Sequence, residues 1–487
     1  MNIRERFKPY TFGDPVEVYK RHTNFDDDSA SVLFQSKGGN AFFTREEPDR
    51  PQLNGAYAQN NLIALSALEI SAKDDKFTMK ATSPVGVELL KEFSPDDFGY
   101  ATGVRYENDT ITGTVEKTQT GELSLEDAIM QPNTTFVIRT VLDKFKPFLN
   151  YPFAGLYGAF SYDFARNLFD FGNKFERTTP DFKLFLASNT LHYDGEHGGS
   201  EHVQLEVNEI SDPLTENSTI PIYQPPDIPD YEDMSLDQYE KKVGQIVKDI
   251  RNGRVSQCVL SRNYGIPTQT HPFNSYTQLQ EINESPYLFF QKFSKDEFLY
   301  GASPELHIRL RGNELEIRPI AGTARRDPNP NLDKLVRRAL FDSEKDRAEH
   351  FMLLDLAKND ANYLAEIASV IVDPHAILEQ YPNLYHMVSG VKATIREKFD
   401  AIHALLATLP AGTLSGSPKV EAMTMLETEL EESSRGFYGG AIGYFLFNGD
   451  FNSGITIRSV HARKLANQIY MSFIRSGAGV VADSDPK

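Results

Sequence analysis

Apolar and polar residues alternate over short runs in the first half of the chain, and this period of two is typical of β-strands. Residues 136–142, 155–164 and 202–207 are such runs, and polar turns separate them. Helical patterns in this part are brief. The first half is therefore predicted to be rich in β-strands.

The pattern changes at residues 211–233, where prolines lie among acidic and amide residues without a sustained apolar period. We interpret this segment as a linker. It divides the chain into an N-terminal β-rich region, residues 1–230, and a C-terminal region, residues 231–487. The C-terminal region carries most of the candidate functional residues.

Three helices are predicted in the C-terminal region from their start signals. A capping box at Ser235 precedes apolar residues at helical spacing. Ser343 is the expected N-cap of a long helix over residues 343–369. A third helix is predicted from Pro418, with Ser417 as its cap.

The rest of the C-terminal region has the pattern of strands. Alternating apolar residues flank a Gly312-Asn313 turn and predict a hairpin, and an Asn448-Gly449 turn predicts a second one. The pattern therefore indicates an α+β fold with several antiparallel sheets. Strands are predicted over residues 255–264, 287–293, 306–310, 315–317, 440–447, 452–461 and 468–474.

Composition narrows the class of protein. Of 487 residues, 40% are apolar and 24% are charged, as in ordinary globular proteins. The net charge of −19 argues against a protein that mainly binds nucleic acid or anionic lipid. The single cysteine, Cys258, excludes an internal disulfide and a cysteine-clustered metal site. No export signal or membrane-spanning run is visible, so we expect a cytoplasmic location.

Asp346 and Glu349 are the first candidate group for chemistry. Residues three apart on a helix lie on the same face, together with the adjacent His350. Two carboxylates on one face can hold Mg²⁺, which prefers oxygen ligands and keeps several waters. An acidic first turn that only suits the helix dipole gives the same pattern.

Three further candidates are ligands or proton donors for a small acidic molecule. The loop at residues 410–419 brings amides and hydroxyls to a helix N-terminus, which favours a carboxylate or phosphate; a simple capped turn is the alternative. Arg458 and a turn at residues 477–479 suit a second carboxylate, unless the arginine is only solvated. His386 suits a general acid or base, unless it is a core histidine.

A series of motifs then carries a resemblance to a known family. In this order, the chain contains Gln257, residues 301–305, 318–323 and 347–350, Asp355 to Asp360, and residues 409–419, 438–441, 457–458 and 477–486. These motifs resemble those of the chorismate-utilising enzymes, and most closely the anthranilate synthase component I family. The resemblance implies an α+β fold in which antiparallel sheets pack face to face with helices on the outside.

Two positions separate the reactions of this family. Isochorismate- and salicylate-forming relatives carry a lysine where this chain has Gln257, and a neutral amide cannot serve as the base that activates water. Aminodeoxychorismate synthases carry a lysine nucleophile where this chain has Ala321. The resemblance therefore implies that chorismate reacts with ammonia at C2 and then loses pyruvate, which gives anthranilate for tryptophan biosynthesis.

The resemblance also implies roles for individual residues. Glu305 is the expected acid for the leaving C4 hydroxyl, and His386 is expected to assist the loss of pyruvate. Mg²⁺ is expected at Glu349 and Asp346, although relatives often have Glu at the latter position. The expected substrate contacts are Gly322, Thr323, Thr413, Tyr438, Arg458, Gly477, Ala478 and Gly479.

Two further partners follow from the resemblance. Cys258 lacks the Gly-x-Cys-x-Gly setting of a glutaminase nucleophile, so a separate glutamine amidotransferase subunit is expected to supply ammonia. Tryptophan is expected as a feedback inhibitor at two segments that contain Ser36 and, further along, Pro286, Tyr287 and Leu288. The first segment has Gln35 where the family commonly has Glu, and this loss of a carboxylate weakens the expected feedback.

Some alternatives stay open. The family continues past residues 484–486 with a helix that supplies another metal-binding glutamate and a lysine near the substrate, whereas this sequence ends at Lys487. If those groups are lacking, a non-catalytic homologue that binds chorismate or tryptophan is the alternative. There are two further alternatives. One is isochorismate synthesis, and the other is amination that stops at aminodeoxyisochorismate.

Overall fold

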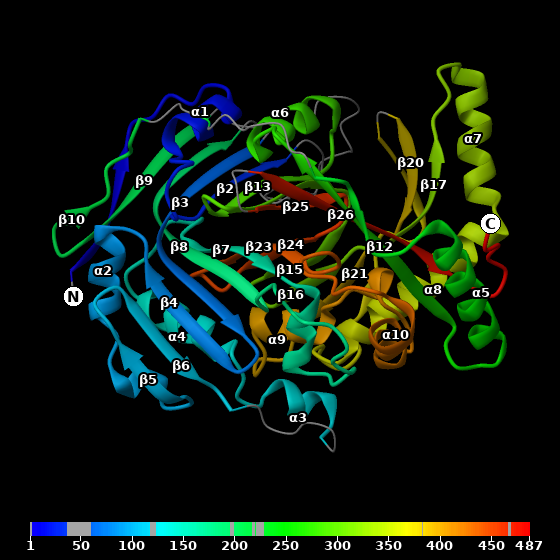
Figure 1. Ribbon diagram of the computed structural model, residues 1–487, viewed down its shortest axis with the longest axis horizontal. Helices are drawn as coiled ribbons and strands as arrows, with labels where there is room; N and C mark the ends of the chain where they lie inside the picture. Colours follow the sequence, from blue (N-terminus) through cyan, green and yellow to red (C-terminus); the bar gives the residue numbers. More distant parts are fainter. Residues whose placement is uncertain are drawn as a thin grey trace.

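Two long strands, β3 (Asn60–Lys73) and β8 (Phe182–Asp194), organise the computed structural model (Figure 1). They pair with each other in antiparallel fashion, with register shifts around Ser66. On its other edge, β3 pairs first with β2 (Ser31–Ser36) and then with β4 (Lys76–Ala81). Since β3 takes two different neighbours along one edge, it belongs to two sheets. The structure describes residues 2–36, 60–116, 123–194, 199–216, 220, 228–381, 383–465 and 469–487.

The first sheet extends from β2 to β12, and the second extends from β8 to β18; all of their strand pairs are antiparallel. The first sheet has the order β2, β13 (Tyr287–Ser294), β14 (Glu297–Ser303), β25 (Ser459–Lys464), β26 (Tyr470–Val480) and β12 (Gln257–Thr268). The second has the order β8, β7 (Gly155–Phe160), β23 (Ala441–Leu446), β24 (Phe451–Ile455), β15 (Leu306–Arg311), β16 (Glu314–Ile317), β21 (Val391–Thr394) and β18 (Ile371–Val372).

The remaining strands form a third, separate sheet or extend the two large sheets. Outside these sheets, a three-stranded sheet projects from the molecule next to α7 (Figure 1). Its strands are β17 (Ile320–Arg325), β20 (Leu384–Val388) and β19 (Ile377–Gln380). The other strands are β1 (Ile3–Lys8), β5 (Thr102–Tyr106), β6 (Thr110–Thr114), β9 (Gly199–Val207), β10 (Ile210–Ser211), β11 (Tyr231–Glu232) and β22 (Gly416–Ser417). Of these, β6 lies between β4 and β5, and β9 lies between β8 and β1.

An apolar core lies between the two sheets. Phe34 and Phe289 from the first sheet pack with Tyr157 and Tyr444 from the second, and Phe185 of β8 joins them. All five side chains are buried. The expected face-to-face packing of antiparallel sheets is therefore confirmed.

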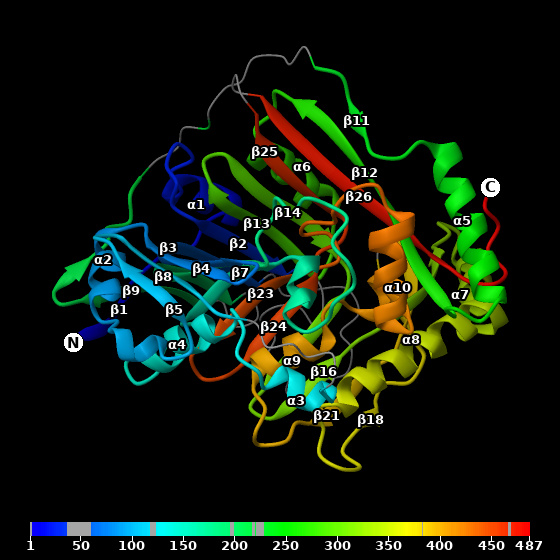
Figure 2. The ribbon, with the colours of Figure 1, turned by 60° about the horizontal axis from the view of Figure 1, so that its bottom comes forward.

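Helices cover the outer faces of the sheets (Figures 1 and 2). Separate apolar clusters join α1 and α6 to the first sheet, α2, α4 and α9 to the second, and α5 and α10 to the ends of β12 and β26. The helices are α1 (Pro15–His22), α2 (Pro84–Lys91), α3 (Leu125–Ile129), α4 (Phe136–Phe145), α5 (Leu236–Arg251), α6 (Pro272–Ile282), α7 (Pro330–Asp342), α8 (Glu344–Asn362), α9 (Ala401–Thr408) and α10 (Lys419–Met425). Shorter helical turns are η1 (Pro95–Phe98), η2 (Tyr162–Asn167), η3 (Gly412–Leu414) and η4 (Leu426–Leu430).

Several sequence-based predictions of elements are confirmed. The capping box of Ser235 begins α5, and Ser343 caps α8, which ends at Asn362 rather than near residue 369. Both predicted hairpins form, β15–β16 and β23–β24. Part of the predicted linker, residues 217–219 and 221–227, lies outside the described residues.

Three predictions of helices and strands outside the candidate site are wrong. Residues 136–142 belong to α4, because Val137, Ile138, Val141 and Phe145 repeat at helical spacing and bury one face. Ser417 lies in β22, so Pro418 takes the N-cap position of α10 without a side-chain cap. The predicted strand over residues 452–461 is two strands, β24 and β25, which belong to different sheets.

Strands from before and after the predicted linker pair with one another. In the first sheet β2 pairs with β13, and in the second sheet β7 pairs with β23. The sheets are thus built from both parts of the chain. The first and second halves therefore share the core between the sheets.

Candidate active site

Gln257 and Glu349 both lie near Gly479, which is close to the end of β26. A Cβ atom placed on Gly479 would lie 3.0 Å from Gln257 Nε2 and 3.9 Å from Glu349 Oε1. The Gln257 side chain is buried, and its Oε1 atom has no hydrogen-bond partner among the described residues. A buried acceptor without a partner is costly, so this oxygen is suited to bind a donor from a ligand.

The predicted turn at residues 477–479 is instead the last part of a strand. Gly477, Ala478 and Gly479 pair with Ser261, Leu260 and Val259 of β12, and all three are exposed. A Cβ on Gly477 would lie 2.8 Å from Tyr438 Oη and 2.9 Å from the Leu260 backbone oxygen, so a larger residue would force these groups to move. The prediction of a turn was wrong because glycines also occur in strands where another group approaches the backbone closely.

The projecting three-stranded sheet brings Thr323 and His386 together. These residues are opposite each other on β17 and β20, and the Thr323 hydroxyl lies 2.8 Å from His386 Nδ1. Burial lowers the pKa of His386, and the positive charge of Arg458 lowers it further. His386 is therefore a neutral imidazole near neutral pH, with Nδ1 held by Thr323. Gly322 lies beside them at φ +84, a conformation that favours glycine.

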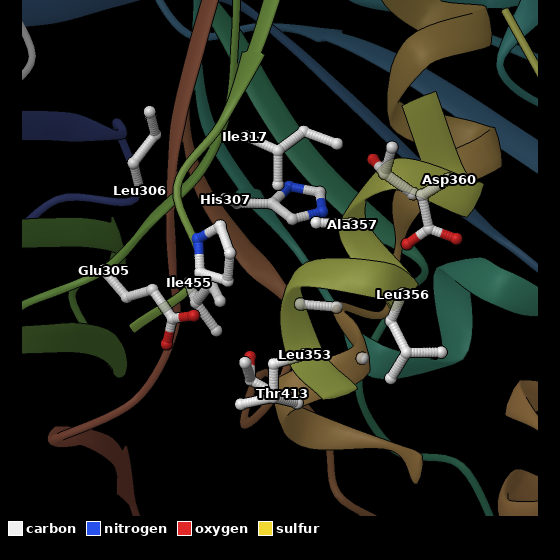
Figure 3. Close-up of a pocket in the computed structure, with 14 residues that line it drawn as sticks. Glu305, Leu306, His307, Ile317, Leu353, Leu356, Ala357, Asp360, Thr413 and Ile455 are labelled. Atoms are coloured by element: carbon white, nitrogen blue, oxygen red, sulfur yellow. The ribbon is translucent and has the colours of Figure 1, made fainter. Parts of the chain in front are cut away.

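Glu305 is a buried carboxyl group at the beginning of β15, in the link that follows β14 (Figure 3). Burial raises its pKa to about 8, although interactions with the Thr413 hydroxyl, the Ile320 amide and Arg458 act in the opposite direction. Glu305 is therefore mostly protonated at neutral pH. A protonated carboxyl group in a buried site can act as a general acid.

Arg458 lies in the short link between β24 and β25, directly before β25 begins. Its φ is +51, which costs a non-glycine residue of the order of 1 kcal/mol. Its charge acts on both Glu305 and His386, so the guanidinium lies near both groups. The side chain is exposed, which leaves it accessible to an anionic ligand.

Asp346 and Glu349 lie on one side of the first turns of α8. Burial and the negative charge of Asp346 raise the pKa of Glu349. A cation would relieve this repulsion, so the pair fits part of a Mg²⁺ shell. His350 is turned away and bonds Ser389 at 2.7 Å. Among the described residues, no group of three or more His, Cys, Asp or Glu side chains is placed to share one ion.

The loop at residues 410–419 differs from the predicted anion site at a helix N-terminus. Thr413 lies beside Glu305, but Lys419 forms an ion pair with buried Asp360, at 2.9 Å to both carboxylate oxygens. The short helix α10 begins at Lys419. The contribution of this loop to the site is therefore Thr413 rather than a helix N-terminus.

Sequence reasoning named Thr413 but missed His307 and Thr408, which lie behind Glu305. His307, Asp360, Thr408 and Thr413 line a cavity of about 30 Å³ together with Glu305 and several apolar residues (Figure 3). His307 is fully buried, and burial lowers its pKa to about 3. Glu305 lies directly before β15 and His307 is the second residue of β15, and this spacing of two residues was an available signal.

The two segments expected to bind tryptophan are neighbouring strands. Leu288 of β13 is opposite Gln35 of β2, and Tyr287 and Ser36 are buried nearby. The Ser36 hydroxyl has no partner among the described residues. Gln35 is bonded to Asn61 and Tyr276, at 3.1 and 2.6 Å. Pro286 lies directly before β13.

Comparisons with known proteins agree with this fold. Residues 94–487 match the sequence profile described as chorismate binding enzyme. The chain therefore belongs to the chorismate binding enzyme family. No described helix has the length and apolar character that crossing a membrane requires.

Relatives within this family carry a more specific name. Anthranilate synthase component 1 from Aquifex aeolicus is 34% identical over 380 residues, which covers 72% of this chain and 75% of that protein. The Cereibacter sphaeroides protein of the same name is 41% identical over 249 residues, 51% of this chain and 48% of that protein. The latter match thus spans about half the length of the relative.

Solved structures agree with the fold. Anthranilate synthase component I from Streptococcus pneumoniae TIGR4 superposes with a TM-score of 0.64 at 26% identity, over 91% of this chain and 92% of that one. The menaquinone-specific isochorismate synthase from Escherichia coli superposes with a TM-score of 0.62 at 14% identity, over 100% and 90% of the two chains. The second likeness concerns the fold alone.

Proposed function

We propose that this protein is an anthranilate synthase component that converts chorismate and ammonia to anthranilate, pyruvate and water. The observation that carries the proposal is the neutral amide of Gln257, whose Nε2 lies near Gly479 and whose buried Oε1 has no hydrogen-bond partner among the described residues. This oxygen can accept a hydrogen bond from ammonia and orient its lone pair. An amide cannot deprotonate water, which disfavours isochorismate synthesis.

Glu305 is the proposed acid of the first step. Ammonia adds at C2 of chorismate, the ring double bonds shift, and the C4 hydroxyl leaves as water after it takes a proton. The raised pKa keeps the Glu305 carboxyl protonated at neutral pH for this transfer. The excess proton of the added nitrogen returns to solvent or to the Glu305 carboxylate.

His386 is the proposed base of the second step. Its lowered pKa keeps the imidazole neutral, and Thr323 holds Nδ1, so Nε2 is the nitrogen available to take the C2 proton. Loss of that proton makes the ring aromatic as the C3–O bond breaks. The departing enolpyruvate takes a proton and becomes pyruvate.

The two substrate carboxylates need different partners. Arg458, Tyr438, and the exposed backbone from Gly477 to Gly479 are the proposed contacts of the enolpyruvyl carboxylate. Asp346 and Glu349 would hold Mg²⁺, and the ion would neutralise the ring carboxylate. Gly322, Thr323 and Thr413 complete the proposed substrate contacts.

Two partners belong to this proposal. A glutamine amidotransferase subunit would supply ammonia, since burial raises the pKa of Cys258 to about 12 and makes it a poor nucleophile. Tryptophan would act as a weak feedback inhibitor between β2 and β13, because Gln35 offers no carboxylate to the ligand's ammonium group. A cytoplasmic location is the expected setting for this biosynthetic role.

The test is the fluorescence of anthranilate formed from chorismate with Mg²⁺ and ammonium, with pyruvate followed in parallel. We expect both products in equal amounts, no product with EDTA, and no product with glutamine in place of ammonium. Release of pyruvate without anthranilate, or complete inertness toward chorismate, would overturn the proposal. Amination without pyruvate would instead indicate an aminodeoxyisochorismate synthase.

The variant Gln257→Lys examines the role of the amide, with Gln257→Glu as a control of similar size. We expect the lysine variant to lose anthranilate formation and to gain a small amount of isochorismate. The carboxylate variant should lose activity without this new product. Unchanged anthranilate formation in the lysine variant would contradict the assigned role.

A further inference from the structure

Arg435 is a buried arginine that has no role in the proposed reaction. It lies between η4 and β23, three residues before Tyr438. Its ion-pair partner is Glu431, with Nη2 at 2.7 Å from Oε1 and Nε at 3.0 Å from Oε2. The guanidinium group has further donors, and two of them reach backbone carbonyl groups.

Both carbonyl groups belong to neighbours of candidate site residues. Nη1 donates to the Leu414 oxygen at 2.5 Å, and Leu414 directly follows Thr413. Nη2 donates to the Val259 oxygen at 2.6 Å, and Val259 is opposite Gly479 in the pairing of β12 with β26. The guanidinium group therefore joins the loop that contains Thr413 to the strands beside Gly479.

The same arginine also contacts Tyr438. The Tyr438 amide donates to the Arg435 carbonyl oxygen at 3.1 Å. The central guanidinium carbon lies 5.9 Å from the centre of the Tyr438 ring and 4.5 Å from the centre of the Tyr162 ring. A cation this close to the face of an aromatic ring is attracted to it. The position of the Tyr438 ring is thus coupled to that of the guanidinium group.

The three segments are in close contact with one another. A Cβ on Gly439 would lie 3.5 Å from Leu414 Cβ, and a Cβ on Gly477 would lie 2.8 Å from Tyr438 Oη. A shift of one segment is therefore transmitted to the next. The Val259 amide also donates to the Ser415 oxygen at 3.0 Å, so loss of the guanidinium group should loosen the loop without detaching it.

We propose that Arg435 is a positioning residue that holds Thr413 and Tyr438 in place against the strand at residues 477–479. This inference rests on the proposed function, in which these residues contact chorismate. An arginine suits the task because its planar group has five N–H donors in fixed directions, so it can bond a carboxylate and two carbonyl oxygens at once. A lysine has the same charge but not this fork of donors.

The test compares Arg435→Lys with Arg475→Lys as a matched control. Both variants retain the positive charge, and Arg475 belongs to the same ion cluster, at 3.3 Å from Glu431 Oε2. The backbone oxygens that accept from Arg475 are those of Ser433 and Ser434, which are not adjacent to Thr413 or Gly479. The control therefore loses an arginine fork in this cluster without losing the contacts that carry the proposal.

The first readout separates KM from kcat. In Arg435→Lys we expect the KM for chorismate to rise about tenfold, the effect of one weakened hydrogen bond to a charged group, with kcat within about threefold of the parent protein. Arg475→Lys should change both constants by less than about twofold. In a Tyr438→Phe background, Arg435→Lys should raise KM by only about threefold, because both changes weaken the same substrate contact. Equal KM changes in the two lysine variants, or full additivity with Tyr438→Phe, would overturn the inference.

A second readout does not need turnover. Hydrogen exchange followed by mass spectrometry should show faster amide exchange at residues 410–416 and 436–440 in Arg435→Lys, and parent rates there in Arg475→Lys. Parent rates at both segments in Arg435→Lys would overturn the inference. If the parent protein left chorismate untouched, the proposed function would fail, whereas the exchange comparison would still decide the role of Arg435.

The test does not depend on the folding of one variant. If Arg435→Lys did not fold, the double variant Arg435→Met with Glu431→Leu would replace it, because removal of both members of a buried ion pair is tolerated better than removal of one. The same rise in KM and the same faster exchange are expected. Parent values of both in the folded double variant would overturn the inference.

Discussion

Two buried glutamates near the site, Glu305 and Glu431, have opposite protonation states. Burial raises the pKa of Glu305 to about 8, because the polar groups around it only partly compensate. Glu431 is equally buried, but Arg435, Arg475 and Ser261 bond its carboxylate and lower its pKa despite the burial. The difference shows that burial raises the pKa of a carboxyl group and that nearby cations can reverse this rise.

The regions around Glu431 and Glu305 also differ in their contacts. Arg435 bonds Glu431 and also donates to the backbone oxygens of Val259 and Leu414, which ties β12 to the loop that carries Thr413. Glu305 has no comparable ion pair in the part of the chain that the structure describes, and it lies against a small cavity. The ion cluster is thus suited to hold the wall of the site, whereas the Glu305 region is suited to transfer a proton.

The largest expected effect comes from Glu305→Gln. The amide has nearly the same shape but cannot donate the proton, so we expect kcat to fall by about 10²- to 10⁴-fold. Anthranilate fluorescence under saturating chorismate measures the loss. Folding should be retained, as monitored by circular dichroism. Activity within a few-fold of the parent protein would show that another group protonates the leaving hydroxyl.

Glu431→Gln should mainly reduce stability. It leaves Arg435 and Arg475 buried without their shared carboxylate, and we expect a loss of about 3–5 kcal/mol in the free energy of unfolding. Chemical denaturation followed by fluorescence or circular dichroism measures this change. Arg475 also lies 3.2 Å from Asp233. A loss below 1 kcal/mol would mean that Asp233 alone compensates Arg475, and it would contradict the contrast between Glu431 and Glu305.

The raised pKa of Glu305 predicts a pH dependence with a definite sign. The unfolded carboxyl group ionises near 4.5 and the folded one at about 8, so folding favours the protonated form. Its contribution to stability is complete below pH 4.5 and decreases as the pH rises to 8, by an amount on the order of 4 kcal/mol. We expect Glu305→Gln to remove this slope in denaturation curves recorded between pH 5 and 9. Parallel slopes for both proteins would contradict the shift.

The smallest expected effect is that of Ser261→Ala. The Ser261 hydroxyl donates to Glu431 Oε1 at 2.6 Å, and its removal leaves the two arginines in place. We therefore expect a loss of about 1 kcal/mol in the free energy of unfolding. Differential scanning calorimetry can resolve this change. A loss as large as that of Glu431→Gln would mean that the hydroxyl, rather than the charge, holds the cluster together.

The predictions from sequence were best where one residue or one local pattern decides the outcome. Ser235 and Ser343 cap helices as expected, because a cap depends on its own turn of backbone. The structure brings Thr323 into contact with His386 and places Gln257 and Glu349 near Gly479, and the roles expected of these residues stay predictions. The error at residues 136–142 arose because a short apolar run fits both a strand and a buried helix.

Other features could not be predicted from sequence because they depend on distant segments. The Lys419–Asp360 pair joins residues 59 apart, and the Glu431–Arg475 contact joins residues 44 apart. The break at Arg458 occurs because β24 and β25 pair with strands of different sheets, and no turn residue marks it. Local patterns carry no information about such partners.

The sequence by itself determined the α+β class, the starts of α5 and α8, both hairpins and the residue types at the candidate site. Only the tertiary structure decided the protonation states. Glu305 and Glu431 are the same residue type, and their pKa values differ in direction because folding buries one beside a cavity and the other between two arginines. Burial and charge pairing arise from contacts between distant parts of the chain, and these exist only after the sheets have packed.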